Sequence, residues 1–167
     1  YAAIPADCRA VAAVCGGEVL REVPFETFLA KLPECRRQCG DRAVLRAFHV
    51  YADNDRVAKQ VEALRAGDFD AFLQLVNESG LSSWEYLQNV IPAGYKEHQE
   101  VAVTIAAAKH ILNGHGAVRV HGGGFAGTVQ AFVPVELLAD FKAQMETILG
   151  EGRCHVLSIR PEGGAVL

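Results

Sequence analysis

Residues 122–127, Gly-Gly-Gly-Phe-Ala-Gly, form a glycine cluster between two runs of alternating apolar residues. Glycine reaches positive φ without strain, and its missing Cβ lets backbone N–H groups turn toward an anion or a neighbouring segment. Because the runs 117–121 and 128–133 both alternate as strands do, the cluster is predicted to connect two strands. A loop of this kind either lies against a phosphate group or is a glycine-rich hairpin without a ligand.

The cluster differs from the two commonest glycine motifs for phosphates. A dinucleotide fingerprint requires a helix directly after the loop, and a Walker loop requires Lys followed by Ser or Thr. Here Thr128 follows Gly127 without a preceding Lys, and the next run is a predicted strand, so both motifs are excluded.

Other residues that could do chemistry lack the spacing it needs. Cys35 and Cys39 lie one helical turn apart, but without a second pair they are interpreted as ordinary helix residues rather than zinc ligands. His121 borders the glycine cluster, and we expect a neutral imidazole hydrogen-bonded within the sheet. No metal ligand is predicted, and six histidines are interpreted as surface or packing residues: His49, His98, His110, His115, His121 and His155.

The composition indicates one globular domain over residues 1–167. Half of the residues are apolar, which is enough for a single core at this length. The formal net charge of −4 argues against a nucleic-acid partner. No apolar run is long enough to cross a bilayer, so no membrane association is expected.

Five cysteines, an odd number, fit reduced thiols and the cytoplasm. Since the chain opens at Tyr1 and its single methionine is Met145, we expect a piece of a longer protein.

Apolar periodicity predicts a helical half followed by a small sheet. Asp68 is expected to cap a helix, and the helices on either side of Gly67 are expected to pack as an antiparallel pair. The fold class is therefore α+β, with a small antiparallel sheet covered by helices. Helices are expected over 7–14, 25–32 with a continuation through 39, 42–66, 69–76, 97–112 and 137–149. Strands are expected over 117–121, 128–133 and 154–160, with a brief edge strand over 18–23.

Four segments occur in an order that is similar to a known family. They are Cys8-Arg9 with 20–23, the stretch 46–69, the glycine cluster, and 154–156 with 163–165. In this order they resemble the carboxyl-terminal domain of bacterial galactokinases, members of the superfamily named for galactokinase, homoserine kinase, mevalonate kinase and phosphomevalonate kinase. The third motif of that superfamily is a glycine loop between strands, which stands here as 122–127. The resemblance implies the ferredoxin-like carboxyl-terminal domain of a two-domain kinase.

The resemblance also implies a reaction, the ATP-dependent phosphorylation of a sugar at its anomeric hydroxyl, most simply galactose to galactose 1-phosphate. It places the catalytic residues, and most contacts to ATP and Mg²⁺, in an amino-terminal kinase domain outside this chain, so no catalytic residue is assigned here. A non-catalytic sugar or nucleotide sensor with the kinase fold stays open, as does a stand-alone α+β interaction module. The implied nucleotide-binding residues are Gly122, Gly123, Gly124, Phe125, Ala126 and Gly127.

One stretch imitates a family motif, while a second stretch and one loop position depart from the family pattern. Residues 80–83, Gly-Leu-Ser-Ser, imitate a phosphate loop but are interpreted as helix capping by the two serines, with core packing by Trp84 and Leu87. Residues 78–86 lack the Ser-His and Arg-Asp pairs common in galactokinases, which bears on the identity of the sugar. Ala126 replaces a loop glycine and predicts an ordinary φ at that position.

Overall fold

The chain folds into a helical half and a small sheet packed with two further helices. The computed structural model describes residues 1–125, 127–159 and 161–162. Short turns of 3-10 helix cover Leu20–Glu22 and Val135–Leu137, and a turn of π-helix covers Ser83–Leu87. The predicted α+β class is confirmed. The main elements are α1 (Ala3–Cys15), α2 (Phe25–Ala30), α3 (Leu32–Cys39), α4 (Asp41–Ala66), α5 (Phe69–Ser82), α6 (Glu100–Leu112), β1 (Ala117–Val120), β2 (Val129–Phe132) and α7 (Leu138–Leu149).

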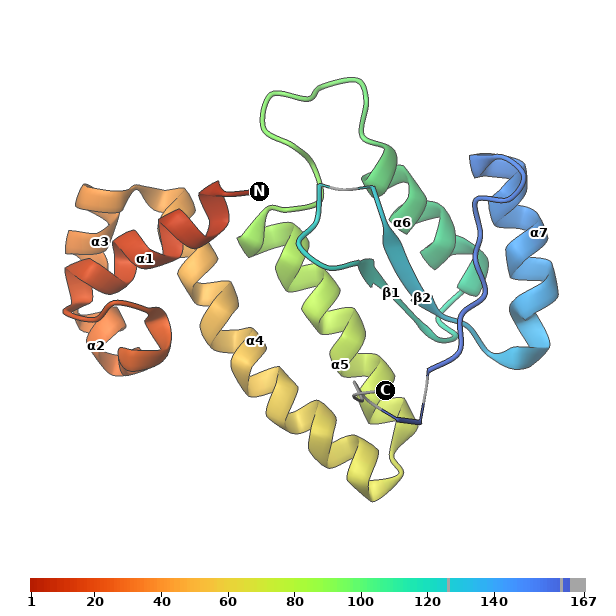
Figure 1. The fold of residues 1–167 in the computed structure, drawn as a ribbon, viewed down its shortest axis with the longest axis horizontal. Helices are drawn as coiled ribbons and strands as arrows, with labels where there is room; N and C mark the ends of the chain where they lie inside the picture. Colours follow the sequence, from red (N-terminus) through yellow and green to blue (C-terminus); the bar gives the residue numbers. More distant parts are fainter. Residues whose placement is uncertain (126, 160, 163–167) are drawn as a thin grey trace, which may run out of the picture.

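The long helix α4 organises the helical half. Figure 1 shows α1, α2 and α3 at its amino-terminal end and α5 running back beside it in the opposite direction. Gly67, at φ 72°, ends α4, and the Asp68 carboxylate accepts a hydrogen bond from the Ala71 amide at 2.9 Å to begin α5. The predicted cap and the predicted antiparallel pair are therefore both confirmed.

A first apolar core lies where α1, α2 and α3 meet α4. Phe28 is fully buried, and its ring packs edge-on against Phe48 with 5.0 Å between ring centroids. Cys35 is fully buried in the same core, with its Sγ 3.7 Å from that of Cys15. Burial raises the pKa of Cys35 to about 12, so its thiol stays protonated at neutral pH and packs as a small apolar group.

A second core joins the sheet to α6 and α7. β1 and β2 pair antiparallel, with Ala117 opposite Phe132 and Val120 opposite Val129. Val118 and Val120 of β1 are almost fully buried and pack in one cluster with Ile105 of α6 and Met145 of α7, among others. Both strands predicted to flank the glycine cluster are therefore present, as a hairpin with one apolar face covered by helices.

The free edge of β1 is covered by α5. The Asn77 side chain of α5 accepts a hydrogen bond from the Val118 amide at 3.1 Å and donates one to the Gly116 carbonyl at 3.2 Å, as a neighbouring strand would. Gly80 brings the helix close, because a Cβ there would lie 2.9 Å from the Cβ of Arg119 and 3.1 Å from the Val118 carbonyl oxygen. The helical half is thus fixed to the strand that enters the glycine loop.

Two strand predictions were wrong. Residues 18–23 contain a 3-10 turn instead of an edge strand, and the Glu22 carboxylate closes it by accepting a hydrogen bond from the Glu18 amide at 2.9 Å. Residues 153–159 have no regular secondary structure, and Leu157 and Ile159 are 87% and 88% exposed. Alternation alone therefore did not produce a strand, since neither segment lies against a ladder partner in the described part of the chain; Arg160 is outside it.

The helix predictions were correct in kind but not always in extent. α1 begins at Ala3, before the predicted start, while α6 begins three residues later than expected, at Glu100. The expected continuation at Pro33 is a separate helix, α3, in which this proline occupies the first turn. No helix among residues 1–125, 127–159 and 161–162 is both long enough and apolar enough to cross a membrane.

The close approach of α5 to β1 predicts that Gly80→Val destabilises the chain by about 1–3 kcal/mol, because the added methyl groups must displace the β1 backbone. Urea unfolding followed by circular dichroism measures this change. The matched control is Glu78→Val on the exposed side of the same helix, which introduces the same side chain away from β1 and loses only an exposed hydrogen bond from Gln74, so it should cost less than about 1 kcal/mol. Equal effects for the two variants would contradict the tight packing of Gly80.

Candidate functional site

The glycine loop is built from backbone conformations that favour glycine. Gly122, Gly124 and Gly127 have φ values of 60°, 74° and 83°, and Phe125 also lies in the left-handed region at φ 57°. The His121 amide donates to the Thr128 carbonyl at 3.0 Å and closes the base of the loop. The backbone conformation therefore favours glycine, as predicted, at Gly122, Gly124 and Gly127. Ala126, whose φ was predicted, is outside the described residues.

One side of the loop packs tightly on the segment that follows α5. The Phe125 amide donates to the backbone carbonyl of Asn89 at 3.0 Å. A Cβ at Gly124 would clash with the Asn89 backbone carbonyl and side chain, and a Cβ at Gly123 would clash with the ring of Tyr1. The absence of a side chain at these two glycines thus lets the loop backbone lie against Asn89 and Tyr1.

The other side of the loop is open. A Cβ at Gly122 or at Gly127 would meet no atom within 4 Å. Within the described ranges, no hydrogen bond engages the backbone amides of Gly122 or Gly123. Two successive amides beside a positive-φ glycine form the kind of backbone nest that binds anions.

A hollow of about 340 Å³ lies next to the loop, lined by Phe125, Tyr1, Gln88 and two arginines. Arg46 is almost fully buried and donates to Asp7 at 2.6 Å, and Arg42 donates to the same Asp7 oxygen at 3.0 Å. Two guanidinium groups therefore share one carboxylate. The surplus positive charge favours an anionic ligand in or near this hollow.

The π-turn at Ser83–Leu87 leads to Gln88, which lines the hollow. The prediction that Ser82 and Ser83 cap a helix was wrong. Ser82 and Ser83 keep helical backbone angles where α5 passes into the π-turn, and the structure gives no side-chain capping hydrogen bond at the start of that turn. Trp84 is 36% exposed and is not a core residue. Instead, the Leu87 carbonyl accepts a hydrogen bond from Arg46 at 3.1 Å, and Gln88 takes a left-handed φ of 56°. Single π-turns of this kind occur frequently at functional sites.

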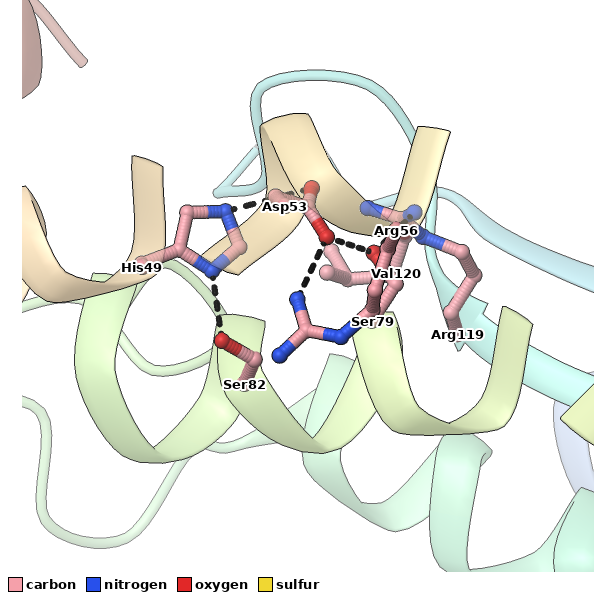
Figure 2. Close-up of polar contacts among 7 residues, drawn as sticks. All are labelled: His49, Asp53, Arg56, Ser79, Ser82, Arg119 and Val120. Atoms are coloured by element: carbon pink, nitrogen blue, oxygen red, sulfur yellow. Dashed lines mark hydrogen bonds and ion pairs between the residues drawn. The ribbon is translucent and has the colours of Figure 1, made fainter. Parts of the chain in front are cut away.

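A polar network behind the loop joins α4, α5 and β1 (Figure 2). Asp53 accepts hydrogen bonds from Arg56 and from the Ser79 hydroxyl, both at 2.7 Å. Arg119 donates to the Ser79 oxygen at 2.7 Å and to the Val120 carbonyl at 3.0 Å. Because Val120 directly precedes the loop at His121, the network holds the strand end from which the loop departs.

His49 completes this network as a buried histidine. Its Nδ1 lies 2.9 Å from the Ser82 hydroxyl, and its Nε2 lies 3.5 Å from Asp53. Burial lowers the pKa of His49 below its ordinary value of 6.5; Asp53 opposes this shift, while Arg56 and Arg119 add to it. In the neutral ring, Nδ1 accepts from Ser82 and Nε2–H faces the carboxylate.

The loop is predictable from the sequence, but the residues that support it are not all so. His49, Asp53 and Arg56 follow one another at the i, i+4 and i+3 spacing of one helix face, which was a usable signal. Asn89 gave no such signal, because its role depends on a contact with a loop 35 residues later in the chain. The expected hydrogen bond of the His121 imidazole is not found among the described residues, since that side chain is exposed.

Gly127 is open and Gly124 is packed against Asn89, so substitution by alanine should lower the free energy of unfolding by different amounts at the two positions. Gly127→Ala should cost about 1 kcal/mol, from the left-handed backbone conformation alone. Gly124→Ala should cost at least about 2 kcal/mol more than that, because the Asn89 carbonyl must also move. Urea unfolding of both variants measures the difference. Costs that agree within error would contradict the close contact with Asn89.

The buried His49 predicts that stability depends on pH. Because its folded pKa is lowered, its neutral form stabilises the fold fully above about pH 6.5, and this contribution is lost as pH falls below that value. The carboxyl groups with lowered pKa, Asp41 and Glu146, act in the same direction only below about pH 4.5.

Urea unfolding between pH 7.5 and 5 measures the effect. His49→Gln should lose most of the decline in this window, and His110→Gln, at an exposed site, should retain it. An undiminished decline in His49→Gln would show that another group causes it.

The sequence of the chain is similar to the sequences of known galactokinases. The chain is 30% identical over 135 residues to the galactokinase of Mannheimia succiniciproducens, which covers 81% of the chain and 33% of that protein. It is 32% identical over 130 residues to the galactokinase of Glaesserella parasuis, covering 78% of the chain and 32% of that protein. The chain thus spans about a third of the length of these relatives. No family model matches it.

The fold has a counterpart among solved structures. A crystal structure of Lactococcus lactis galactokinase complexed with galactose superimposes with a TM-score of 0.65 over 87% of this chain and 37% of that one, at 22% identity. The similarity in fold covers 37% of the longer protein, close to the 33% that the similarity in sequence covers. The chain is therefore a galactokinase-like domain that corresponds to about a third of such proteins.

Proposed function

We propose that this chain is the carboxyl-terminal domain of a two-domain, ATP-dependent sugar kinase, and that its substrate is galactose, which is converted to galactose 1-phosphate. The glycine loop forms one wall of a cleft whose other wall is an amino-terminal kinase domain. The observation that carries the proposal is the loop itself: in a galactokinase-like domain, the amides of Gly122 and Gly123 make no hydrogen bond among the described residues, and the loop is open at Gly122 and Gly127.

The residues of the loop fit a nucleotide triphosphate in chemistry and in shape. The amides of Gly122 and Gly123 are donors without partners in the described part of the chain, and a side chain at Gly122 would occupy the open face. The hollow that Phe125 of the loop lines also contains Arg42 and Arg46, which share the Asp7 carboxylate. Amides and surplus positive charge together suit the oxygens of a phosphate chain.

Magnesium is assigned to the other domain and to the nucleotide. Among the residues described here, no group of three or more His, Cys, Asp or Glu side chains is arranged to hold a metal ion. When bound, Mg²⁺ would neutralise charge on the phosphates. The contribution of this chain is to position the phosphates through backbone amides and to exclude water from the cleft.

This division of roles agrees with the demands of phosphoryl transfer. The reaction requires positioning and electrostatic stabilisation more than covalent chemistry, so a domain without a nucleophile or base still contributes to the rate. In this proposal the network around Asp53 keeps β1 in place, and β1 in turn fixes the start of the loop. Catalytic residues are supplied by the amino-terminal domain.

The proposal predicts which protein turns over substrate. The two-domain protein that contains this chain should consume ATP in the presence of galactose, and not with homoserine or mevalonate as controls, in a coupled assay of ADP release. The chain alone should fold but show no sugar-dependent ATP consumption, because it supplies only one wall of the cleft.

Each outcome bears on a different part of the proposal. Turnover by the chain alone would overturn the assignment of catalysis to another domain. Turnover of a different sugar, with none of galactose, would overturn the substrate and direct attention to the divergent stretch 78–86. No turnover of any sugar by the two-domain protein would overturn the kinase function itself and favour a sensor.

A further inference from the structure

Asn89 is a buried polar residue whose side chain makes no hydrogen bond to any residue that the structure describes. It is 1% exposed, and both its Nδ2 and its Oδ1 lack a partner among the described residues. An amide removed from water without a partner destabilises the folded state, so such groups are rare in native proteins and call for an explanation.

The position of Asn89 links it to the glycine loop. Its backbone carbonyl accepts the hydrogen bond from Phe125, and its side chain lies against Gly124, where no Cβ could fit beside Nδ2. It directly follows Gln88, whose left-handed φ of 56° ends the π-turn. The carboxamide is therefore held against the backbone of the loop by a strained segment.

A purely structural role does not account for the carboxamide. The fixed contact with the loop uses the backbone carbonyl of Asn89, which any residue would supply. A leucine has nearly the same shape, could make the same backbone bond, and would remove two unsatisfied polar atoms. Residues that lower stability without an evident gain in the fold are expected at functional sites.

We propose that Asn89 is a positioning residue of the glycine loop: its carboxamide hydrogen-bonds to the loop backbone when the loop binds the phosphates of a nucleotide. This inference rests on the proposed function. In this proposal the paired carboxamide holds the amides of Gly122 and Gly123 toward the phosphates. Asn89 itself does not contact the ligand, because its side chain lies buried behind Gly124.

The chain offers a matched control in Asn77. Its carboxamide makes two hydrogen bonds, to the Val118 amide and to the Gly116 carbonyl, and holds α5 to β1. Both Asn77→Leu and Asn89→Leu delete a carboxamide. The carboxamide of Asn77 has hydrogen-bond partners, whereas that of Asn89 has none among the described residues.

The first measurement is the thermal unfolding of both variants of the chain. Asn89→Leu should leave the melting temperature unchanged or raise it by about 2–4 °C, since it removes unsatisfied polar atoms. Asn77→Leu should lower it by a similar amount or more. A melting temperature that falls in Asn89→Leu as far as in Asn77→Leu would show that the Asn89 carboxamide serves the fold, and would overturn the proposal.

The second measurement is steady-state kinetics of the two-domain protein. Asn89→Leu should raise the KM for ATP about tenfold and leave the KM for the sugar unchanged. Asn77→Leu serves as the control for stability alone, because the α5–β1 edge that it weakens also positions the loop. An unchanged KM for ATP in Asn89→Leu would overturn the positioning role while the kinase function stands. Absence of turnover in the unmodified protein would overturn the kinase function, and with it this inference.

Discussion

The contact between α5 and β1 is the interaction on which the rest of the structure depends. A two-stranded sheet is marginal by itself, and here its outer edge is completed by the Asn77 side chain rather than by a third strand. Gly80 permits the helix to come within contact distance of the strand backbone. Because α5 also packs along α4, the contact between α5 and the edge of β1 fixes the hairpin and its loop relative to the helical half.

The glycine loop is consequently fixed from two directions. From β1, the network of Asp53, Ser79 and Arg119 holds the carbonyl of Val120 at the point where the loop begins. From the end of α5, the backbone of Asn89 holds Phe125 in the middle of the loop. Both supports originate on the α4–α5 pair, so the open amide face has a defined orientation although the loop has no regular secondary structure.

The sequence was sufficient for the features that local pattern determines. The hairpin, the helix ends at Gly67 and Gly150, the Asp68 cap and the positive-φ glycines all follow from period and composition. It was insufficient where the outcome depends on a distant partner. Residues 154–159 alternate as a strand should, yet extended chain becomes a strand only beside a ladder partner. Likewise Ser82 has the composition of a cap, but it lies at the carboxyl end of a helix and bonds to His49 instead.

The distribution of strain agrees with the location of the site. Three residues other than glycine have positive φ in the described chain, and Asn113 is the helix C-cap of α6, where asparagine is common. The other two, Gln88 and Phe125, both line the hollow beside the glycine loop. Left-handed backbone at a residue with a bulky side chain lowers stability and persists only where surrounding contacts enforce it. The fold thus places two unfavourable backbone conformations and the unsatisfied Asn89 carboxamide where the loop meets the segment after α5, beside the hollow, which fits a site shaped for a ligand rather than for stability.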